Sequence, residues 1–221
     1  MKSFFLKYKH MLLFSYGFIY LPWFIYLENH VTSNYHVIHM NIDDNIPFIP
    51  IFIIPYLLWF VYVASVLVYQ CFSNAEDFKR NCAFLFSGMT IFLIISTIYP
   101  NGHHLRPEVY PDQSIFTQMV MALHATDTPT NLFPSIHVYN SIGTHFAIIH
   151  SATLKNKKGI RVASFLLMIS ICMATVFLKQ HSMFDVLTGI LMAAIIYPLA
   201  YHREVLAFAQ RKKYVRVKKS N

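Results

Sequence analysis

The sequence predicts an all-α polytopic membrane protein with six transmembrane helices, folded as one domain over residues 1–221. Hydrophobic residues make up 56% of the chain and charged residues only 13%, which is too apolar for a water-soluble domain of this length. Apolar stretches of membrane-spanning length recur along the chain, and basic residues gather at alternate connections between them. No internal repeat and no hydrophilic stretch of domain length interrupts this pattern.

Five segments are each long and apolar enough to cross a hydrocarbon core of about 30 Å, which takes about 20 helical residues. They cover residues 11–27, 50–68, 82–98, 162–178 and 186–201. A sixth segment, residues 136–150, is less apolar and contains Asn140, Ser141, Thr144 and His145. Because polar side chains are costly against lipid, we expect this helix to face the interior of the bundle.

The placement of the 18 basic residues predicts the orientation of the helices. They lie before the first span, between the second and third, between the fourth and fifth, and in the tail from Arg203 onward. Only Arg106 and Lys179 fall on the other side, which leaves sixteen of the eighteen on one side. The positive-inside rule makes that side cytoplasmic, together with both termini. The placement of the basic residues, which give the net charge of +8, therefore indicates a multi-pass protein of the cell membrane, and we expect no nucleic-acid partner.

Two connections on the extracytoplasmic side, residues 28–48 and 101–134, are long enough to build a site. The first contains His30, His36 and His39 with Asp43 and Asp44, which are residue types that bind metals. Their spacing is irregular and they share no predicted element, so we favour a solvated polar loop and expect no metal site. Cys71, Cys82 and Cys172 also lack metal-ligand spacing and are expected to be packing residues.

The second long connection contains a predicted amphipathic helix. Its apolar residues recur at helical spacing and are Ile115, Phe116, Met119, Val120 and Leu123. Asp112 and Ser114 precede them and can cap the first turn. We expect this helix to lie at the membrane surface, where it either covers the bundle or forms one wall of an entrance.

Three polar clusters fall at predicted helix ends on the extracytoplasmic side. They are Arg106-Pro107, the run from Pro134 through Ser135 and Ile136 to His137, and the run from Lys179 through Gln180 to His181 with Asp185. Taken alone, none of these clusters indicates an active site, since a single histidine at a helix end is usually an interfacial residue. The predicted topology, however, places all three at one membrane level, and this convergence predicts an active site on the extracytoplasmic face.

The chemistry of the clusters favours an anion site with two histidines. His181 and Asp185 are four residues apart, so the carboxylate can accept one ring N–H and orient the other nitrogen. His137 opens a helix after Ser135, where free backbone N–H groups and the helix dipole favour a phosphate. Arg106 offers a planar donor fork for phosphate oxygens, and Lys179 adds a second positive charge.

In order and spacing, these clusters resemble the three signature motifs of the type 2 phosphatidic acid phosphatase superfamily, over about residues 99–189. The resemblance implies a lipid phosphate substrate and a reaction without cofactor or metal. It implies that His181 attacks phosphorus to form a phosphohistidine, that Asp185 orients His181, and that His137 protonates the leaving oxygen. Arg106 and Ser135 would bind the phosphate.

The sequence departs from the family pattern at three places. Tyr99 stands where the first motif usually has lysine, Ala174-Thr175 where the third usually has Ser-Arg, and Ile136 where the second often has glycine. Two usual cations are therefore missing. Lys179 is placed to replace one of them, and its Lys-Gln-His run is similar to that of a divergent branch resembling inositol phosphorylceramide synthases.

Three functions are compatible with these residues. The leading one is hydrolysis of a lipid phosphate, such as phosphatidic acid, phosphatidylglycerol phosphate or a polyprenyl diphosphate. The second passes the same phosphoryl intermediate to an alcohol, which makes the protein a lipid phosphotransferase, because pocket shape and water access choose the acceptor. The third is a non-catalytic lipid-binding or transport protein, which the missing cations would suit.

Overall fold

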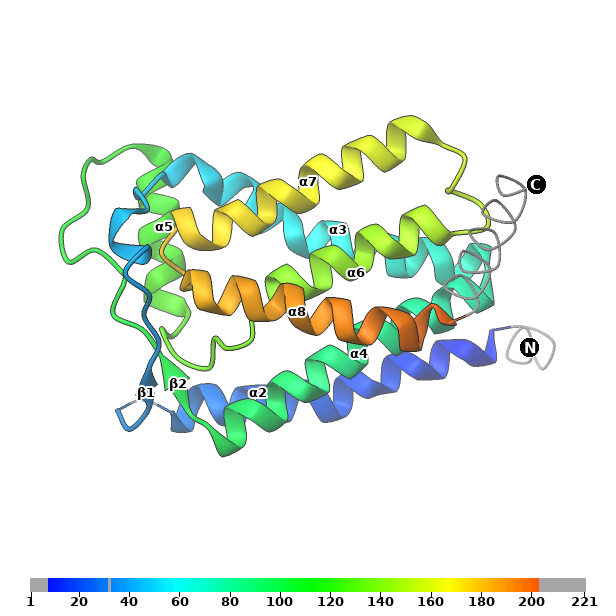
Figure 1. Ribbon diagram of the computed structural model, residues 1–221, viewed down its shortest axis with the longest axis horizontal. Helices are drawn as coiled ribbons and strands as arrows, with labels where there is room; N and C mark the ends of the chain where they lie inside the picture. The colour runs from blue at the N-terminus through cyan, green and yellow to red at the C-terminus, as the bar shows by residue number, and fades with distance from the viewer. Residues whose placement is uncertain (1–7, 32, 203–221) are drawn as a thin grey trace, which may run out of the picture.

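Six long helical segments lie side by side and alternate in direction along the chain (Figure 1). The structure is a computed structural model that describes residues 8–31 and 33–202. The segments are η1 (Lys9–Tyr16) continuing into α2 (Gly17–His30), η3 (Pro50–Phe52) continuing into α3 (Ile53–Ser73), α4 (Ala75–Ile98), α6 (Ile136–His150), α7 (Lys158–Phe177) and α8 (Met183–Ala200). The all-helical fold expected from the sequence is confirmed.

Within the described residues, five segments are long and apolar enough to cross a membrane: Lys9–His30, Pro50–Ser73, Ala75–Ile98, Lys158–Phe177 and Met183–Ala200. The predicted start of the third at residue 82 is too late, because α4 begins at Ala75. The side chain of Asn74 caps it by accepting hydrogen bonds from the Glu76 and Asp77 N–H groups. Asp77 is buried there and accepts from Ser151 and Ala152, so this polar start is part of the packed bundle.

The remaining long helix, α6, has 15 residues and packs against α3, α4, α7 and α8. Its position at the centre of the bundle matches the interior placement expected from its polar residues. The hydroxyls of Ser141 and Thr144 donate to carbonyl oxygens of their own helix, at 2.6 and 2.7 Å. Nδ1 of His145 lies 2.9 Å from the Ser164 hydroxyl of α7. The hydroxyls of Ser141 and Thr144 are therefore buried and paired inside the protein, and the half-buried ring of His145 is paired with a neighbouring helix.

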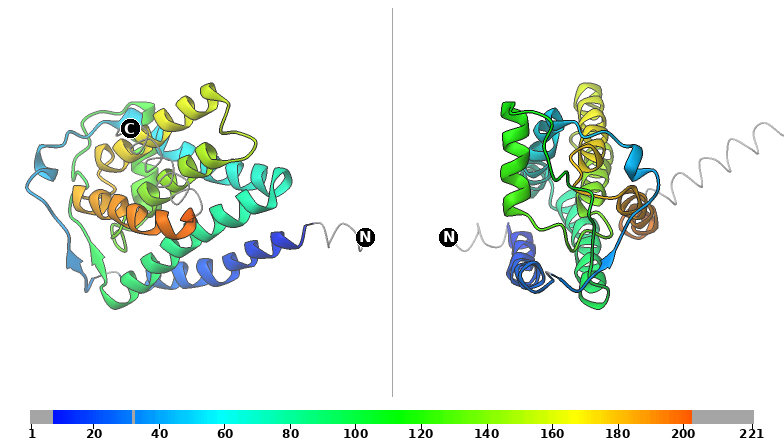
Figure 2. Two further views of the ribbon diagram at one scale, coloured as in Figure 1. Left: turned by 45° about the vertical axis from the view of Figure 1, so that its right-hand side comes forward. Right: turned by 90° about the vertical axis from the view of Figure 1, so that its left-hand side faces the viewer.

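The long connections meet at one end of the bundle, at the left of Figure 1. Two short strands pair there in parallel, β1 (His36–Val37) with β2 (Asn101–Gly102), and η2 (Asp43–Asn45) lies in the first connection. The predicted amphipathic helix is present as α5 (Ile115–Thr126), and Ser114 caps it as expected by accepting the Thr117 N–H. Its buried Val120 packs against the start of α3, and the right-hand view of Figure 2 shows α5 in green along one side of this end.

The described basic residues separate between the two ends of the bundle. The first and last described residues, Tyr8 and His202, lie at the end opposite the long connections (Figure 1). That end also carries Lys9, Lys79, Arg80, Lys155, Lys157, Lys158 and Arg161, whereas Arg106 and Lys179 belong to the end with the long connections. Lys2, Lys7 and the basic tail from Arg203 lie outside the described residues.

Candidate functional site

His137, His181 and Asp185 come together at the end of the bundle that holds the long connections. Nε2 of His181 lies 3.4 Å from Nδ1 of His137, and Nδ1 of His181 lies 3.4 Å from Oδ2 of Asp185. The side chains of His181 and Asp185 are only 4% and 1% exposed, so their interaction is shielded from water. Nδ1 of His181 and Oδ1 of Asp185 make no hydrogen bond with the described residues.

A tight turn between α7 and α8 places His181. Lys179 has a positive φ of 55°, and the backbone N–H groups of Gln180 and His181 both donate to the Thr175 carbonyl at 3.0 Å. Helix α8 then begins with a capping box, in which the Ser182 N–H donates to Oδ2 of Asp185 at 3.0 Å. Asp185 therefore both starts α8 and faces His181. The Ser-x-x-Asp pattern is a recognised helix-start signal that the sequence analysis had not used.

Asp43 fixes the same turn from the first long connection. Its carboxylate accepts the Ser182 hydroxyl at 2.5 Å and the Met183 N–H at 2.8 Å, and it is 1% exposed. The interpretation of this region as a solvated polar loop is therefore wrong for Asp43, although it fits the exposed pair formed by His39 and Asp44. The carboxylate is buried because it supplies acceptors to the unpaired donors of a helix N-terminus.

His137 is held at the start of α6 by contacts on three sides. Ser135 is the N-cap, with its hydroxyl accepting the Val138 N–H at 3.4 Å and its own N–H donating to the Asp185 carbonyl at 3.1 Å. The ring of His137 packs against Tyr56 and Trp59 of α3, at centroid distances of 4.8 and 4.4 Å. Among the described residues, none accepts the N–H of Ile136 or His137, as expected for a helix N-terminus that can bind an anion.

Gly189 lets α8 approach the start of α6. A Cβ at this position would lie 2.8 Å from the Ser135 carbonyl oxygen and 3.3 Å from Cβ of Val138. The absence of a side chain therefore allows the close contact that sets Asp185 beside Ser135 and His181 beside His137.

Arg106 lies behind the histidine pair and not against it. Its guanidinium donates to the carbonyls of His124 and Asp127, at 2.9 and 2.7 Å, and to Oε1 of Gln180 at 3.0 Å. Nε is buried and makes no hydrogen bond. Burial lowers the pKa of Arg106, with Asp127 as the main opposing charge, and the group stays cationic. In this arrangement Arg106 braces the long connection against the turn that carries His181.

Lys179 points away from the histidines. Its ammonium donates to the Asp43 carbonyl at 2.8 Å, and burial lowers its pKa against the opposing charges of Asp43 and Asp44. The structure therefore does not bring Lys179 to the histidine pair, where the sequence analysis had expected a second cation. The positive φ of the residue directs the side chain to the first long connection.

Two histidines that the sequence analysis missed anchor the long connection. His103 donates from Nε2 to the Gln180 carbonyl at 3.0 Å and accepts the Leu105 N–H on Nδ1 at 3.1 Å. His124 lies 3.0 Å from the Leu178 carbonyl through Nε2 and 2.7 Å from the Tyr110 hydroxyl through Nδ1. Burial lowers the pKa of each to about 4, so both rings are neutral at pH 7 and serve as structural links.

A cavity of about 40 Å³ adjoins the histidine pair. Besides His137 and His181, its lining includes two carboxylates that the sequence analysis did not identify, Glu28 of α2 and Asp127 after α5. Oε2 of Glu28 accepts the Thr128 hydroxyl at 2.5 Å. Burial raises the pKa of Asp127, and Arg106 opposes this shift. Roughly 10–15 Å³ accommodates one water, so the cavity holds a few waters and is much smaller than a lipid head group.

The three motifs thus converge only in part. His137, His181 and Asp185 meet, Ser135 caps the helix beside them, Arg106 lies behind Gln180, and Lys179 points elsewhere. Within residues 8–31 and 33–202, no group of three or more His, Cys, Asp or Glu side chains is placed to hold a metal ion. Comparison of the chain with protein-family models, with curated proteins and with solved structures found no match.

Proposed function

We propose that this protein is a metal-independent membrane phosphatase that hydrolyses a lipid phosphate or diphosphate through a phosphohistidine. We further propose that it is a divergent relative of the type 2 phosphatidic acid phosphatases. The observation that carries the proposal is the pair of histidine nitrogens 3.4 Å apart, with a buried carboxylate behind one of them. A purely structural pair does not require a nucleophile, an orienting group and an acid in one place.

We assign the proposed roles to individual atoms on the basis of their distances. Nδ1 of His181 faces Asp185, which leaves the Nε2 lone pair to attack phosphorus while the bond from phosphorus to the leaving oxygen breaks. His137 gives its proton to the leaving oxygen, since its Nδ1 lies on the Nε2 side of His181. Water then attacks the phosphohistidine, His137 takes the proton back, and phosphate and free His181 are released.

Positive charge for this reaction comes from two places. The unpaired N–H groups of Ile136 and His137 lie at the positive end of the α6 dipole. Arg106 contributes its field from behind Gln180 and can bind phosphate directly if one of its carbonyl contacts is exchanged. A phosphoryl group fits between the two histidines only after their rings separate, so substrate binding must open the 40 Å³ cavity.

We place this site on the extracytoplasmic face of a six-span protein. The seven described basic residues of the opposite end, against two at the site end, support this orientation through the positive-inside rule. On this assignment α6 is also a span, the fourth in chain order, and both termini are cytoplasmic. Its 15 residues are fewer than a lipid-facing span needs, but α6 is surrounded by other helices.

A phosphotransferase of the inositol phosphorylceramide synthase type is the second candidate, and Glu28 and Asp127 favour it. Carboxylates repel phosphate oxygens but accept hydrogen bonds from alcohols. Their presence in the lining of the cavity suits an acceptor or leaving group that carries hydroxyls. The third candidate, a non-catalytic lipid-binding or transport protein, predicts no phosphate release in the assay that follows.

The first experiment measures phosphate release by the purified protein from a panel of lipid phosphates in the presence of chelator. Turnover should survive chelation, and vanadate should inhibit because it mimics five-coordinate phosphorus. His181→Ala should abolish turnover, whereas His104→Ala, an exposed histidine on the neighbouring loop, should not. Loss of turnover in chelator with recovery in magnesium would refute the mechanism, and inactivity of the wild type on every lipid would favour the non-catalytic alternative.

The second experiment separates the roles of the histidines with a phosphorus-labelled substrate. His181→Ala should remove covalent labelling, and Asp185→Asn should only weaken it. His137→Ala should be severe for a lipid alcohol and mild for nitrophenyl phosphate, because a good leaving group needs no proton. Labelling that persists in His181→Ala and disappears in His137→Ala would exchange the two roles.

The acceptor is identified by adding candidate alcohols to the labelled lipid. A labelled phosphate ester of the added alcohol indicates transfer, and labelled phosphate alone indicates hydrolysis. If Asp127 binds the acceptor, Asp127→Asn should reduce transfer more than it reduces hydrolysis of nitrophenyl phosphate.

A further inference from the structure

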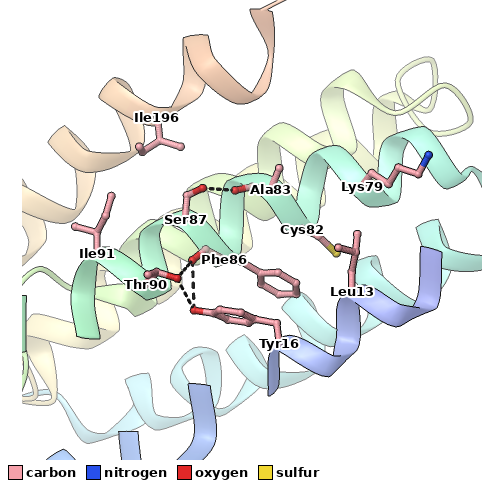
Figure 3. A pocket seen from close by; sticks show the side chains of 10 residues that line it. All are labelled: Leu13, Tyr16, Lys79, Cys82, Ala83, Phe86, Ser87, Thr90, Ile91 and Ile196. Atoms are coloured by element: carbon pink, nitrogen blue, oxygen red, sulfur yellow. Dashed lines mark hydrogen bonds between the residues drawn. The ribbon is translucent and has the colours of Figure 1, made fainter. Parts of the chain in front are cut away.

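Two grooves lie between helices away from the histidine pair. The first has a volume of about 620 Å³ and lies between η1, α4 and α8. Figure 3 shows that its hydroxyls are already paired, with Ser87 and Thr90 donating to Ala83 and Phe86 carbonyls. Its cation, Lys79, forms an ion pair with Glu76 at 2.8 Å. This groove therefore has no unpaired charge to select a ligand.

The second groove, of about 480 Å³, lies between the last turns of α6 and the first turns of α7. Its lining combines two cations with apolar side chains and a histidine: Lys158, Arg161, Val162, Phe165, Ile149 and His145. We call it the α6/α7 groove. It is remote from the candidate active site, because it belongs to the opposite end of the bundle.

The lining residues of α7 are ordered along one face of the helix. Positions 158, 161, 162 and 165 follow the spacing of three and four that keeps residues on one side. The cations occupy the first turn, and Val162 and Phe165 follow deeper in the apolar segment. The span from 158 to 165 is about 10 Å along the axis at 1.5 Å per residue. This order, charge at the end and apolar surface inward, matches the order of groups in a phospholipid.

The cations of the α6/α7 groove have no ion-pair partner within residues 8–31 and 33–202. No described carboxylate lies within ion-pair distance of Lys158 or Arg161, unlike Lys79 in the first groove. The guanidinium of Arg161 makes one long contact, 3.4 Å to the Lys155 carbonyl. Both side chains are exposed and can turn toward an anion at the groove mouth.

We propose that the α6/α7 groove binds an anionic phospholipid of the leaflet on its own side of the membrane. Lys158 and Arg161 bind the phosphate, and one acyl chain lies along Val162, Phe165 and Ile149. Charge complementarity selects the anionic head group, and the apolar floor selects a lipid over a soluble phosphate. The site is independent of the proposed catalytic function.

Native mass spectrometry of the full chain in detergent tests this proposal, with phosphatidylglycerol and phosphatidylcholine as ligands. The wild type should bind phosphatidylglycerol more tightly, and Lys158→Gln with Arg161→Gln should weaken that binding on the order of 30-fold, about fivefold for each cation. The matched control, Lys155→Gln with Lys157→Gln, removes the same charge outside the groove and should have a much smaller effect. Equal loss in both double variants, or equal binding of both lipids, would overturn the proposal.

Two further measurements do not depend on how the variants fold. Glycerol 3-phosphate should not displace the lipid at similar concentration, and displacement would show that the acyl chain is not recognised. A phosphatidylglycerol with a photoreactive group in its acyl chain should label peptides with residues 145–149 and 162–165 of the wild type. Equal or stronger labelling of residues 83–91, in the groove of Figure 3, would count against a selective site.

Discussion

Removal of the Asp43 carboxylate should loosen the turn that carries His181, although Asp43 lies more than a hundred residues away in sequence. Asp43→Ala leaves the Ser182 hydroxyl and the Met183 N–H without their acceptor, in a place where Asp43 is 1% exposed. It also frees the Met40 N–H, which donates to the same carboxylate at 2.8 Å. The start of α8 would then lose its hydrogen bonds to the side chain of Asp43 in the first long connection.

The magnitude follows from the number of buried donors. Each unsatisfied buried donor costs about 1–3 kcal/mol, and the gain from no longer burying a carboxylate offsets part of this. We expect a loss of about 3 kcal/mol, which at 2–4 °C per kcal/mol lowers the unfolding temperature by roughly 6–12 °C. Asp43→Asn keeps one acceptor but turns an amide donor toward a second donor, so about 1–2 kcal/mol should be lost.

The assay compares thermal unfolding of Asp43→Ala with that of Asp44→Ala in the same detergent or nanodisc. Asp44 is the exposed neighbour, with a side chain 65% exposed and paired with His39, so its loss should cost below about 0.5 kcal/mol. If the proposed activity is present, Asp43→Ala should also reduce turnover by about 10- to 100-fold through misplacement of His181. Equal unfolding temperatures for the two variants would refute the described role of Asp43.

Three other predictions concern helix packing, pH and topology. Gly189→Ala should cost about 1–3 kcal/mol, because its Cβ would lie 2.8 Å from the Ser135 carbonyl, whereas Gly159→Ala, with nothing within 4 Å, should not destabilise the protein. Burial lowers the pKa of His103 to about 4, below the ordinary value near 6.5, so the unfolded chain takes up the proton first as the pH falls. The contribution of His103 to the stability of the fold should therefore be full above about pH 6.5 and fall toward pH 4. His103→Gln should flatten this pH dependence of stability. A cysteine introduced at position 109 should be labelled from outside sealed cells and one at position 156 only after permeabilisation, and the reverse pattern would invert the proposed topology.

The parts of the fold that were predictable depend on local composition. The length and apolarity of a segment are properties of its own residues, and these located the spans within a few residues at most ends. The start of α4 was missed because a membrane-length window excludes polar residues, and Asp77 is polar yet packed inside the protein. Its burial depends on donors from the α6–α7 connection, which no local pattern reveals.

The residues of the candidate site likewise divide into those that the sequence predicted and those that it did not. The spacing of four residues predicted that His181 and Asp185 face each other, although only Asp185 lies in α8 and His181 lies in the turn that precedes it. His137 was placed beside them by counting spans, since alternate helix ends share one face. Asp43, Glu28 and Asp127 were missed because they reach the site through the paths of long connections, and those paths follow no periodic pattern. The direction of Lys179 was likewise decided by one backbone angle in a tight turn.

The distribution of charge around the histidine pair limits how a substrate can be oriented. Glu28 and Asp127 line the cavity, while Arg106 and the unpaired N–H groups of α6 supply the positive field. Two like charges 4 Å apart repel by about 4 kcal/mol at an effective dielectric constant of 20, which is enough to decide an orientation. If the protein acts on a lipid phosphate as proposed, the phosphate is therefore favoured toward the start of α6, with the alcohol portion of the lipid toward the two carboxylates. This orientation would leave His137 near the oxygen that joins the two parts, where the proposed mechanism needs its proton when the bond breaks.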